Sequence, residues 1–295
     1  MPHFMNQKVN HSLGSEIIRL IRPYQWIKNL LLFSPLFFAG RVAESTLLTV
    51  SAGVVLFCLV SSLGYLLNDW MDRKTDVHHF SKKSRPFAAR TVSGKQGILL
   101  AGSLFFGICI LIALYPLPLQ LIFYLVLYTV LTCCYSLYIK NVMILEIFCV
   151  AIGFVVRVQA GGAAADVAIS SWLFLTVFFI SMMISIAKRV NELKELGPDI
   201  AVLHRKSQAG YSDNYLNSML WACGSITLVV YALYAVEHGA LVVYSVVPAS
   251  YGIFRFIYLT DLGRGSDPIR TLFSDRQLLG TTLIFLFFLT IVIYY

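Results

Sequence analysis

About nine apolar segments, each near the length of a membrane-spanning helix, constrain this chain more than any other feature. A helix of about 20 residues crosses a hydrocarbon core of roughly 30 Å. The chain of 295 residues is 58% hydrophobic and only 13% charged, too little polar surface for a soluble protein of this length. The sequence therefore predicts an all-α, polytopic membrane protein. The expected spans lie near residues 25–40, 46–67, 97–115, 118–138, 142–162, 170–188, 216–236, 240–259 and 278–295, of which the first is short and begins in polar sequence.

The segments follow one another without a Pro-, Gly- or Ser-rich linker, a low-complexity tract or a large polar insertion. We therefore expect a single domain over residues 1–295. Residues 1–24 form an N-terminal segment without the apolar core of a cleaved signal. Residues 15–22 within it have the pattern of a short amphipathic helix lying on the membrane surface.

Basic residues concentrate in alternate connections, those after the second, fourth, sixth and eighth spans, whereas the opposite connections hold little beyond Arg41. The positive-inside rule then predicts a multi-pass protein of the cell (cytoplasmic) membrane with its N-terminus and these connections in the cytoplasm. This topology and attraction to anionic lipid explain the net charge of +8 without nucleic-acid binding.

An acidic cluster, Asn68, Asp69, Asp72 and Asp76, directly follows the second span. In a helix, Asn68, Asp72 and Asp76 fall at i, i+4 and i+8, so an amide oxygen and carboxylates can share one face. Oxygen ligands without His or Cys suit Mg²⁺, which completes its shell with substrate phosphates. The cluster predicts a magnesium-bound diphosphate at a membrane surface.

A second polar helix end follows the sixth span. Lys188, Glu192 and Glu195 would lie along one helical stripe, with Arg189 beside it. Because both polar ends are expected on the cytoplasmic side, they could together form a cup for substrates.

Other polar residues leave alternatives open. Arg157 lies about fifteen residues into the fifth span, where an unpaired guanidinium is costly and usually functional, unless a structural partner such as a helix-end carbonyl holds it. Arg255 lies close enough to the end of its span for its guanidinium group to reach the aqueous surface while the rest of the side chain stays in the membrane. Glu146 is left undecided, and His78 and His79 lack the third ligand that a metal site would need.

The motif Asn68-Asp69-x-x-Asp72-x-x-x-Asp76, followed by Lys82-Lys83-Ser84-Arg85-Pro86, resembles the first aspartate motif of the UbiA superfamily of intramembrane prenyltransferases. Tyr135-Ser136-x-x-x-Lys140 also matches, and about nine spans fit that bundle. The resemblance is closest to the decaprenyl-phosphate phosphoribosyltransferase branch. It rests there on Arg22-Pro23-x-Gln25-Trp26-x-Lys28-Asn29, Arg157-x-x-Ala160-Gly161-Gly162 and Lys188-Arg189-x-x-Glu192-Leu193, between about residues 20 and 197.

This sequence differs in one motif from the superfamily members that prenylate aromatic acceptors, and the difference bears on the identity of the donor. Their second Asp-rich motif after the sixth span is missing, and Lys188, Arg189 and Glu192 occupy that region. A donor with a 5-phosphate as well as a diphosphate has more anionic oxygens to neutralise. The added basic residues therefore favour 5-phosphoribosyl 1-diphosphate as donor, although the acidic-pair-then-threonine loop of soluble phosphoribosyltransferases is not present.

The resemblance implies a membrane glycosyltransferase (pentosyltransferase) for cell-wall biogenesis. It would transfer the 5-phosphoribosyl group from 5-phosphoribosyl 1-diphosphate to a polyprenyl (decaprenyl-like) phosphate at the cytoplasmic face, with Mg²⁺, and release diphosphate. Asn68, Asp72 and Asp76 would hold the metal, and Asp69, Asp72 and Asp76 form the expected catalytic group. The expected substrate-binding residues are Lys28, Tyr65, Lys82, Arg85, Lys140, Arg157, Lys188, Arg189 and Glu192.

Two other functions fit part of the pattern. A UbiA-type prenyltransferase would move a prenyl group from a prenyl diphosphate to an aromatic acceptor with the same first motif, but the absent second motif counts against it. A non-enzymatic lipid transporter has no evident use for a set of metal-binding side chains on one face of a helix. A homo-oligomer is left open.

Overall fold

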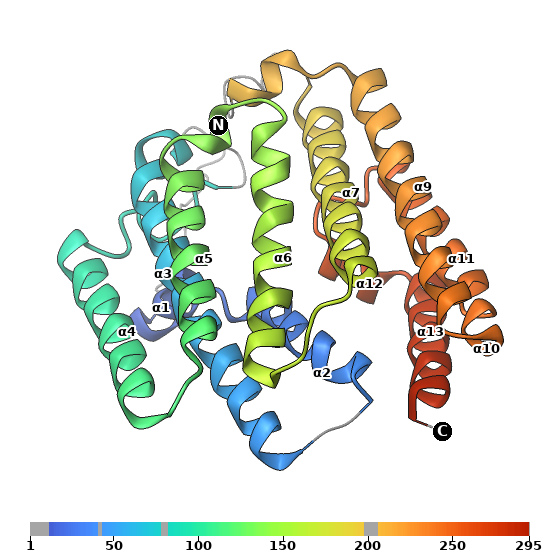
Figure 1. Ribbon diagram of the computed structural model, residues 1–295. Helices are drawn as coiled ribbons and strands as arrows, with labels where there is room; N and C mark the ends of the chain where they lie inside the picture. Colours follow the sequence, from blue (N-terminus) through green and yellow to red (C-terminus); the bar gives the residue numbers. More distant parts are fainter. Residues whose placement is uncertain (1–11, 41–42, 78–81, 198–205, 295) are drawn as a thin grey trace. The chain divides into compact units, whose positions relative to one another are not determined.

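The computed structural model describes residues 12–40, 43–77, 82–197 and 206–294, and every regular element in these ranges is helical. Eight of these helical segments are long and apolar enough to cross a membrane. The predicted all-α polytopic fold class is thereby confirmed (Figure 1). The segments are α3 (Glu44–Asp76), α4 (Gly94–Leu114), α5 (Leu119–Leu137), α6 (Leu145–Ala165), α7 (Ser171–Leu196), α9 (Asp213–Glu237), α10 with α11 (Ala240–Val243 and Val246–Asp261) and α13 (Arg276–Tyr294).

The first of the nine expected spans takes a different form. It consists of a 3₁₀ helix, η1 (Pro23–Phe33), followed by the short helix α2 (Ser34–Phe38), which has a proline in its first turn. This segment is not among the eight spans, because it contains no α-helix long enough to cross a hydrocarbon core. In the described residues, the first expected span is therefore not a membrane-crossing α-helix.

Shorter helices flank the spans. The expected amphipathic helix is present as α1 (Leu13–Ile21), which Ser12 caps and which ends at Arg22 with a left-handed φ of 52°. The connections contain η2 (Ile139–Asn141), η3 (Lys206–Gly210) and α12 (Pro268–Ser274).

By internal contacts the chain forms two compact units that are interleaved in sequence. Unit 1 comprises Met1–Ile27 and Val55–Pro116, and unit 2 comprises Lys28–Val54 and Leu117–Tyr295. In unit 1, Leu20, Leu66, Phe87 and Val92 form a core. In unit 2, α7 packs between α6 and α9, and the largest core cluster lies there (Figure 1). The expectation of a single domain stays a prediction.

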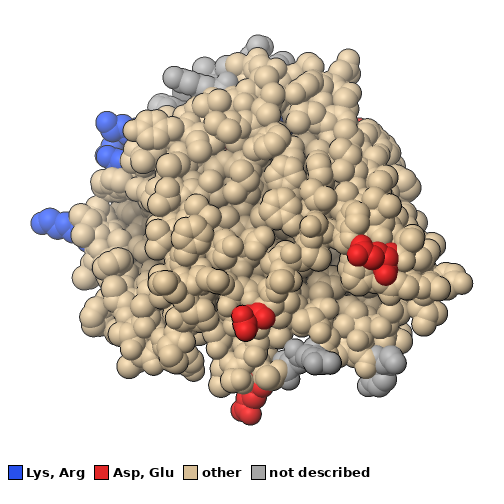
Figure 2. All heavy atoms as spheres, in the orientation of Figure 1, with Lys and Arg blue, Asp and Glu red and all other residues tan. Residues whose placement is uncertain are grey.

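Large apolar side chains cover much of the outer surface. Leu119 is 81% exposed, and Leu99 on α4 and Phe287 on α13 are 76% and 69% exposed. Figure 2 shows one face on which uncharged residues occupy most of the surface and charged side chains are few. Such a surface is unsuited to water and suited to lipid, so the protein is a multi-pass membrane protein.

Gly161 permits a close approach between α6 and η1. A Cβ atom at this position would overlap the carbonyl oxygen of Leu32 and lie 2.7 Å from its carbonyl carbon. The absence of a side chain at Gly161 therefore allows α6 to pack directly against the backbone of η1.

We expect Gly161→Ala to lower the free energy of unfolding by at least about 2–3 kcal/mol, because backbone atoms cannot move aside as a flexible side chain can. Chemical unfolding in detergent micelles measures the change. Gly280→Ala in α13 is the matched control, since a Cβ there meets no atom within 4 Å and should be neutral or slightly stabilising. Equal effects of the two substitutions would contradict the close approach.

Candidate active site

The acidic cluster lies in unit 1, on the last turns of α3. This helix continues without interruption to Asp76, so Asn68, Asp72 and Asp76 follow one another at one-turn intervals, as predicted. Asp69 and Asp76 are buried, with 1% and 5% exposure, whereas Asn68 and Asp72 are partly exposed.

Two arginines bind the buried carboxylates of this cluster. Arg22 Nη2 lies 2.6 Å and 2.8 Å from the two carboxylate oxygens of Asp69. Arg85 Nη1 lies 3.1 Å from Asp69 Oδ1 and 2.8 Å from Asp76 Oδ2. The arginines compensate charges that burial alone would make costly, and they tie α1 and the 82–90 turn to the end of α3.

This pairing bears on which ligands could hold a metal. Over the described ranges, no group of three His, Cys, Asp or Glu side chains is arranged to hold a metal ion. Mg²⁺ is usually bound by one or two carboxylates together with substrate phosphates, so a smaller donor set suffices. Asn68, Asp72 and the Oδ1 atom of Asp76 fit that requirement, because Arg85 contacts the other oxygen of Asp76.

The remaining predicted residues of unit 1 lie close to this cluster in sequence. The guanidinium of Arg22 stacks over the ring of Tyr65 at 5.1 Å. Lys82 begins the turn that carries Arg85 and is partly exposed. The pair His78 and His79 lies outside the described residues.

The polar end of α7 forms a second cluster, in unit 2. Arg189 is only 4% exposed and donates a hydrogen bond from Nη1 to Glu192 Oε2. Its Nε lies 3.4 Å from Glu146 Oε1 on α6, and Glu146 is 1% exposed. Glu146, undecided from sequence, is thus a buried carboxylate that pairs with the predicted phosphate-binding Arg189.

Two residues of η3 complete this second cluster. The Ser207 hydroxyl donates to Glu146 Oε1 at 2.9 Å and lies 3.2 Å from the Lys140 carbonyl oxygen. Gln208 Nε2 donates to Glu192 Oε2 at 3.0 Å. The cluster therefore joins the start of α6, the end of α7 and η3, while Lys188 is exposed on the adjacent position of α7.

A strained turn precedes α6 beside Glu146. Ile144 has φ 65° and ψ −51°, and the N–H of Leu145 donates to the Met143 carbonyl at 2.7 Å, which makes a γ-turn. The N–H of Ile144 donates to the Tyr211 hydroxyl at 2.7 Å. Positive φ at a β-branched residue costs of order 1–3 kcal/mol and concentrates at functional sites.

Arg157 is buried in unit 2 and is held by three neutral groups. Its Nε donates to Asn29 Oδ1 at 2.8 Å, Nη1 to the Gly153 carbonyl at 2.9 Å and Nη2 to the Tyr128 hydroxyl at 2.7 Å. The guanidinium also lies 4.4 Å from the centre of the Tyr128 ring. These contacts match the structural alternative, in which Arg157 joins α6 to η1 and α5; its role toward substrate stays a prediction.

The structure thus gathers the predicted residues into two groups, one in each unit. Unit 1 holds Asn68, Asp69, Asp72 and Asp76 with Tyr65, Lys82 and Arg85. Unit 2 holds Glu192 with Arg189, and also contains Lys28 on η1, Lys140 on η2, Arg157 and Lys188.

Several residues with clear roles in these groups were not among the predicted site residues, including Tyr128 beside Arg157. Arg22 and Asn29 belonged to the motif that carries the family resemblance, but no role was assigned to them. Both are polar residues next to apolar sequence, which could have indicated that they bind partners within the protein. Ser207 and Gln208 lie in a connection with no pattern that points to Glu146 or Glu192.

Known proteins resemble this chain over most of its length. A sequence model of the UbiA prenyltransferase family matches residues 30–279. A decaprenyl-phosphate phosphoribosyltransferase of Mycolicibacterium smegmatis is 32% identical over 90% of this chain and 89% of the relative. A protein of the same name from Mycobacterium tuberculosis is 29% identical over 90% of each.

A solved structure supports the same fold. A UbiA homolog from Archaeoglobus fulgidus, bound to GPP and Mg²⁺, superposes with a TM-score of 0.72 at 15% identity, over 95% of this chain and 100% of that one. At this identity the likeness shows the fold alone. With the family match and the sequence relatives, it leads to one conclusion: the chain is a transferase that belongs to the UbiA prenyltransferase family.

Proposed function

We propose that this protein transfers the 5-phosphoribosyl group of 5-phosphoribosyl 1-diphosphate to a polyprenyl phosphate, at the cytoplasmic face of the cell membrane. The observation that carries the proposal is the close likeness, over nine tenths of the chain, to relatives named decaprenyl-phosphate phosphoribosyltransferase. The basic end of α7 supports it, because Lys188 and Arg189 stand where a second aspartate motif would serve a prenyl diphosphate.

In the proposed reaction, an oxygen of the lipid phosphate forms a bond to C1 of the ribose while the bond from C1 to the diphosphate breaks. Diphosphate leaves with the bonding electrons. The lipid phosphate is already an anion, so the reaction needs no strong general base. Catalysis then depends on bringing two polyanionic substrates together and on stabilising the charge that develops on the leaving group.

The chain's residues divide between these tasks. Asn68, Asp72 and Asp76 would hold Mg²⁺, and Asp69, fixed by Arg22 and Arg85, supports the cluster. When bound, Mg²⁺ supplies positive charge that neutralises the diphosphate and favours its departure. Tyr65 and Glu192 would bind ribose hydroxyls. The proposed phosphate-binding cations are Lys28, Lys82, Arg85, Lys140, Arg157, Lys188 and Arg189.

Membranes that contain the protein should convert phosphoribosyl diphosphate, radiolabelled in its ribose, into an organic-extractable product when polyprenyl phosphate and Mg²⁺ are supplied. EDTA should abolish the product, and membranes without the protein provide the background. If no labelled lipid forms with Mg²⁺ present, the proposed donor is wrong.

A further inference from the structure

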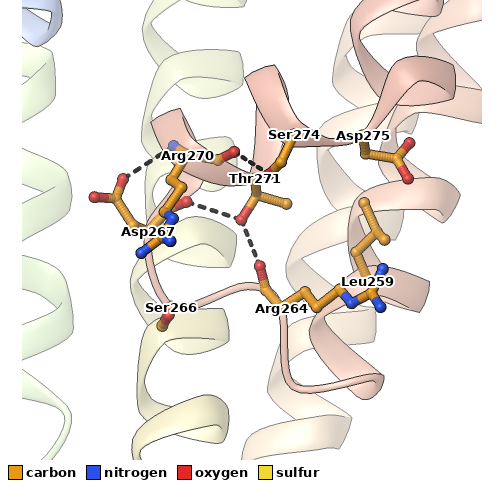
Figure 3. A pocket seen from close by; sticks show the side chains of 8 residues that line it. All are labelled: Leu259, Arg264, Ser266, Asp267, Arg270, Thr271, Ser274 and Asp275. Carbon is orange, nitrogen blue, oxygen red and sulfur yellow. Dashed lines mark hydrogen bonds between the residues drawn. The ribbon is translucent and has the colours of Figure 1, made fainter.

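A polar pocket in unit 2 lies apart in sequence from both clusters described above, in the connection from α11 to α13 (Figure 3). The cavity measures about 350 Å³, which is within the range of sites that hold small ligands. We call it the α11–α13 pocket. It is lined by Leu259, Arg264, Ser266, Asp267, Arg270, Thr271, Ser274 and Asp275.

Both carboxylates of the α11–α13 pocket are engaged within the protein. Asp275 accepts hydrogen bonds from Arg255 Nη2 at 2.7 Å and Nε at 3.2 Å, and this pairing lowers the pKa of Asp275. Asp267 Oδ1 accepts from the backbone N–H groups of Ile269 at 3.0 Å and Arg270 at 3.3 Å. Neither aspartate therefore needs a cation from outside.

Two of the three hydroxyls in the pocket are also engaged. Thr271 donates to the carbonyl oxygens of Arg264 and Asp267, and Ser274 donates to the carbonyl oxygen of Arg270 (Figure 3). These bonds fix the backbone that forms the pocket wall.

The polar groups that remain are all able to donate. Within the described part of the chain, the guanidinium groups of Arg264 and Arg270 and the hydroxyl of Ser266 form no hydrogen bond or ion pair. Both arginines are exposed. In Figure 3, Arg270 extends from α12 toward Ser266, whereas Arg264 extends beside Leu259. Donors at two sides of one cavity suit an anion with several acceptor oxygens.

The location of the pocket indicates where that anion comes from. The connection joins two spans, one ending at Asp261 and the other beginning at Arg276, so it lies where phospholipid headgroups meet water. Leu262 and Phe273, in the same connection, are 51% and 60% exposed. Exposed apolar side chains beside basic ones are typical of segments that contact the membrane interface.

We propose that the α11–α13 pocket binds the headgroup of an anionic membrane phospholipid, with Arg270 and Ser266 on one side of the headgroup and Arg264 on the other. The residues that line this pocket are not among those proposed to bind the substrates, and the proposal does not depend on the identity of the donor.

The pocket wall is attached to the polar end of α7, so an occupied pocket would also stabilise that end. Asn191, with 0% exposure, accepts from the Gly265 N–H at 3.3 Å, and Lys194 Nζ binds Asp261 at 2.8 Å. A Cβ at Gly265 would overlap Thr260 Oγ1 and lie 2.9 Å from Asn191 Nδ2, so the fit is close. Asn191 lies in the helical turn that carries Arg189 and Glu192.

Thermal unfolding of the full-length protein in a neutral detergent tests this site. The probes are short-chain phosphatidylglycerol, short-chain phosphatidylcholine and inorganic phosphate, each titrated separately. We expect phosphatidylglycerol to raise the unfolding temperature of the native protein far more than either of the other probes. Each arginine should contribute about fivefold to the affinity, so Arg264→Gln with Arg270→Gln should weaken phosphatidylglycerol binding about 30-fold.

Two matched variants separate the pocket from general surface charge and from misfolding. Arg276→Gln removes an exposed arginine nearby that does not line the cavity, and it should change the affinity less than twofold. Arg264→Lys with Arg270→Lys should retain most of the binding. Equal losses in the Arg276 and pocket variants would overturn the proposal, as would unchanged binding after the double Gln substitution. Equal stabilisation by inorganic phosphate would assign the site to free phosphate instead of a lipid.

Discussion

Asp72→Asn is expected to lower turnover at least about 100-fold while the protein still folds and inserts into the membrane. The substitution keeps the shape of the side chain and removes one of the few carboxylates that could hold Mg²⁺ on the diphosphate. Asp72 is partly exposed on a continuous helix, where an asparagine of nearly the same shape fits without repacking. Initial rates in proteoliposomes, with the fluorescence-detected elution profile as the folding check, measure both effects.

Asp166→Asn is the matched control for this substitution. Asp166 is an exposed aspartate with φ 54° at the end of α6, a backbone conformation that asparagine also tolerates. It should retain normal turnover. Normal turnover in the Asp72 variant as well would remove the proposed metal site.

Arg189→Met is expected to lower the free energy of unfolding by about 3–5 kcal/mol, since it removes a buried cation that pairs with the buried carboxylate of Glu146. Glu192 would lose a hydrogen-bond donor at the same time. The change should appear in equilibrium unfolding by denaturant in mixed micelles.

Lys188→Met, at the neighbouring exposed position of α7, should cost no more than about 1 kcal/mol. Adding Glu146→Leu to Arg189→Met should recover part of the lost stability, because the buried carboxylate that had paired with Arg189 is then gone. Additive losses in the double variant would show that Glu146 and Arg189 are not coupled.

The course of the chain through the membrane could largely be predicted from hydropathy. Long apolar segments such as residues 46–67 and 97–115 correspond to α3 and α4, because each must satisfy its backbone hydrogen bonds as a helix in lipid. The 3₁₀ form of Pro23–Phe33 could not be predicted in the same way. The packing of this segment was equally unpredictable, because Gly161 lies against the backbone of Leu32, a contact between residues distant in sequence.

The acidic cluster was predictable because its residues share one helix, where spacing alone determines their common face. Its arginine partners were not. Arg22 reaches Asp69 across 47 positions of sequence, and Ser207 reaches Glu146 across 61. Helical periodicity carries no information about such pairs. The depth of Arg157 correctly indicated that it needs partners, but not that Asn29 and Tyr128 supply them.

A parallel comparison of the two candidate donors tests the central claim most directly. Purified protein in proteoliposomes is given phosphoribosyl diphosphate with polyprenyl phosphate, and in parallel a prenyl diphosphate with 4-hydroxybenzoate, each with Mg²⁺. Mass spectrometry of the lipid extracts identifies the products. We predict a polyprenyl phosphate that carries a phosphoribosyl group, with diphosphate released in equal amount, and no prenylated aromatic acid. Prenylation of the aromatic acid without phosphoribosyl transfer would contradict the proposed function.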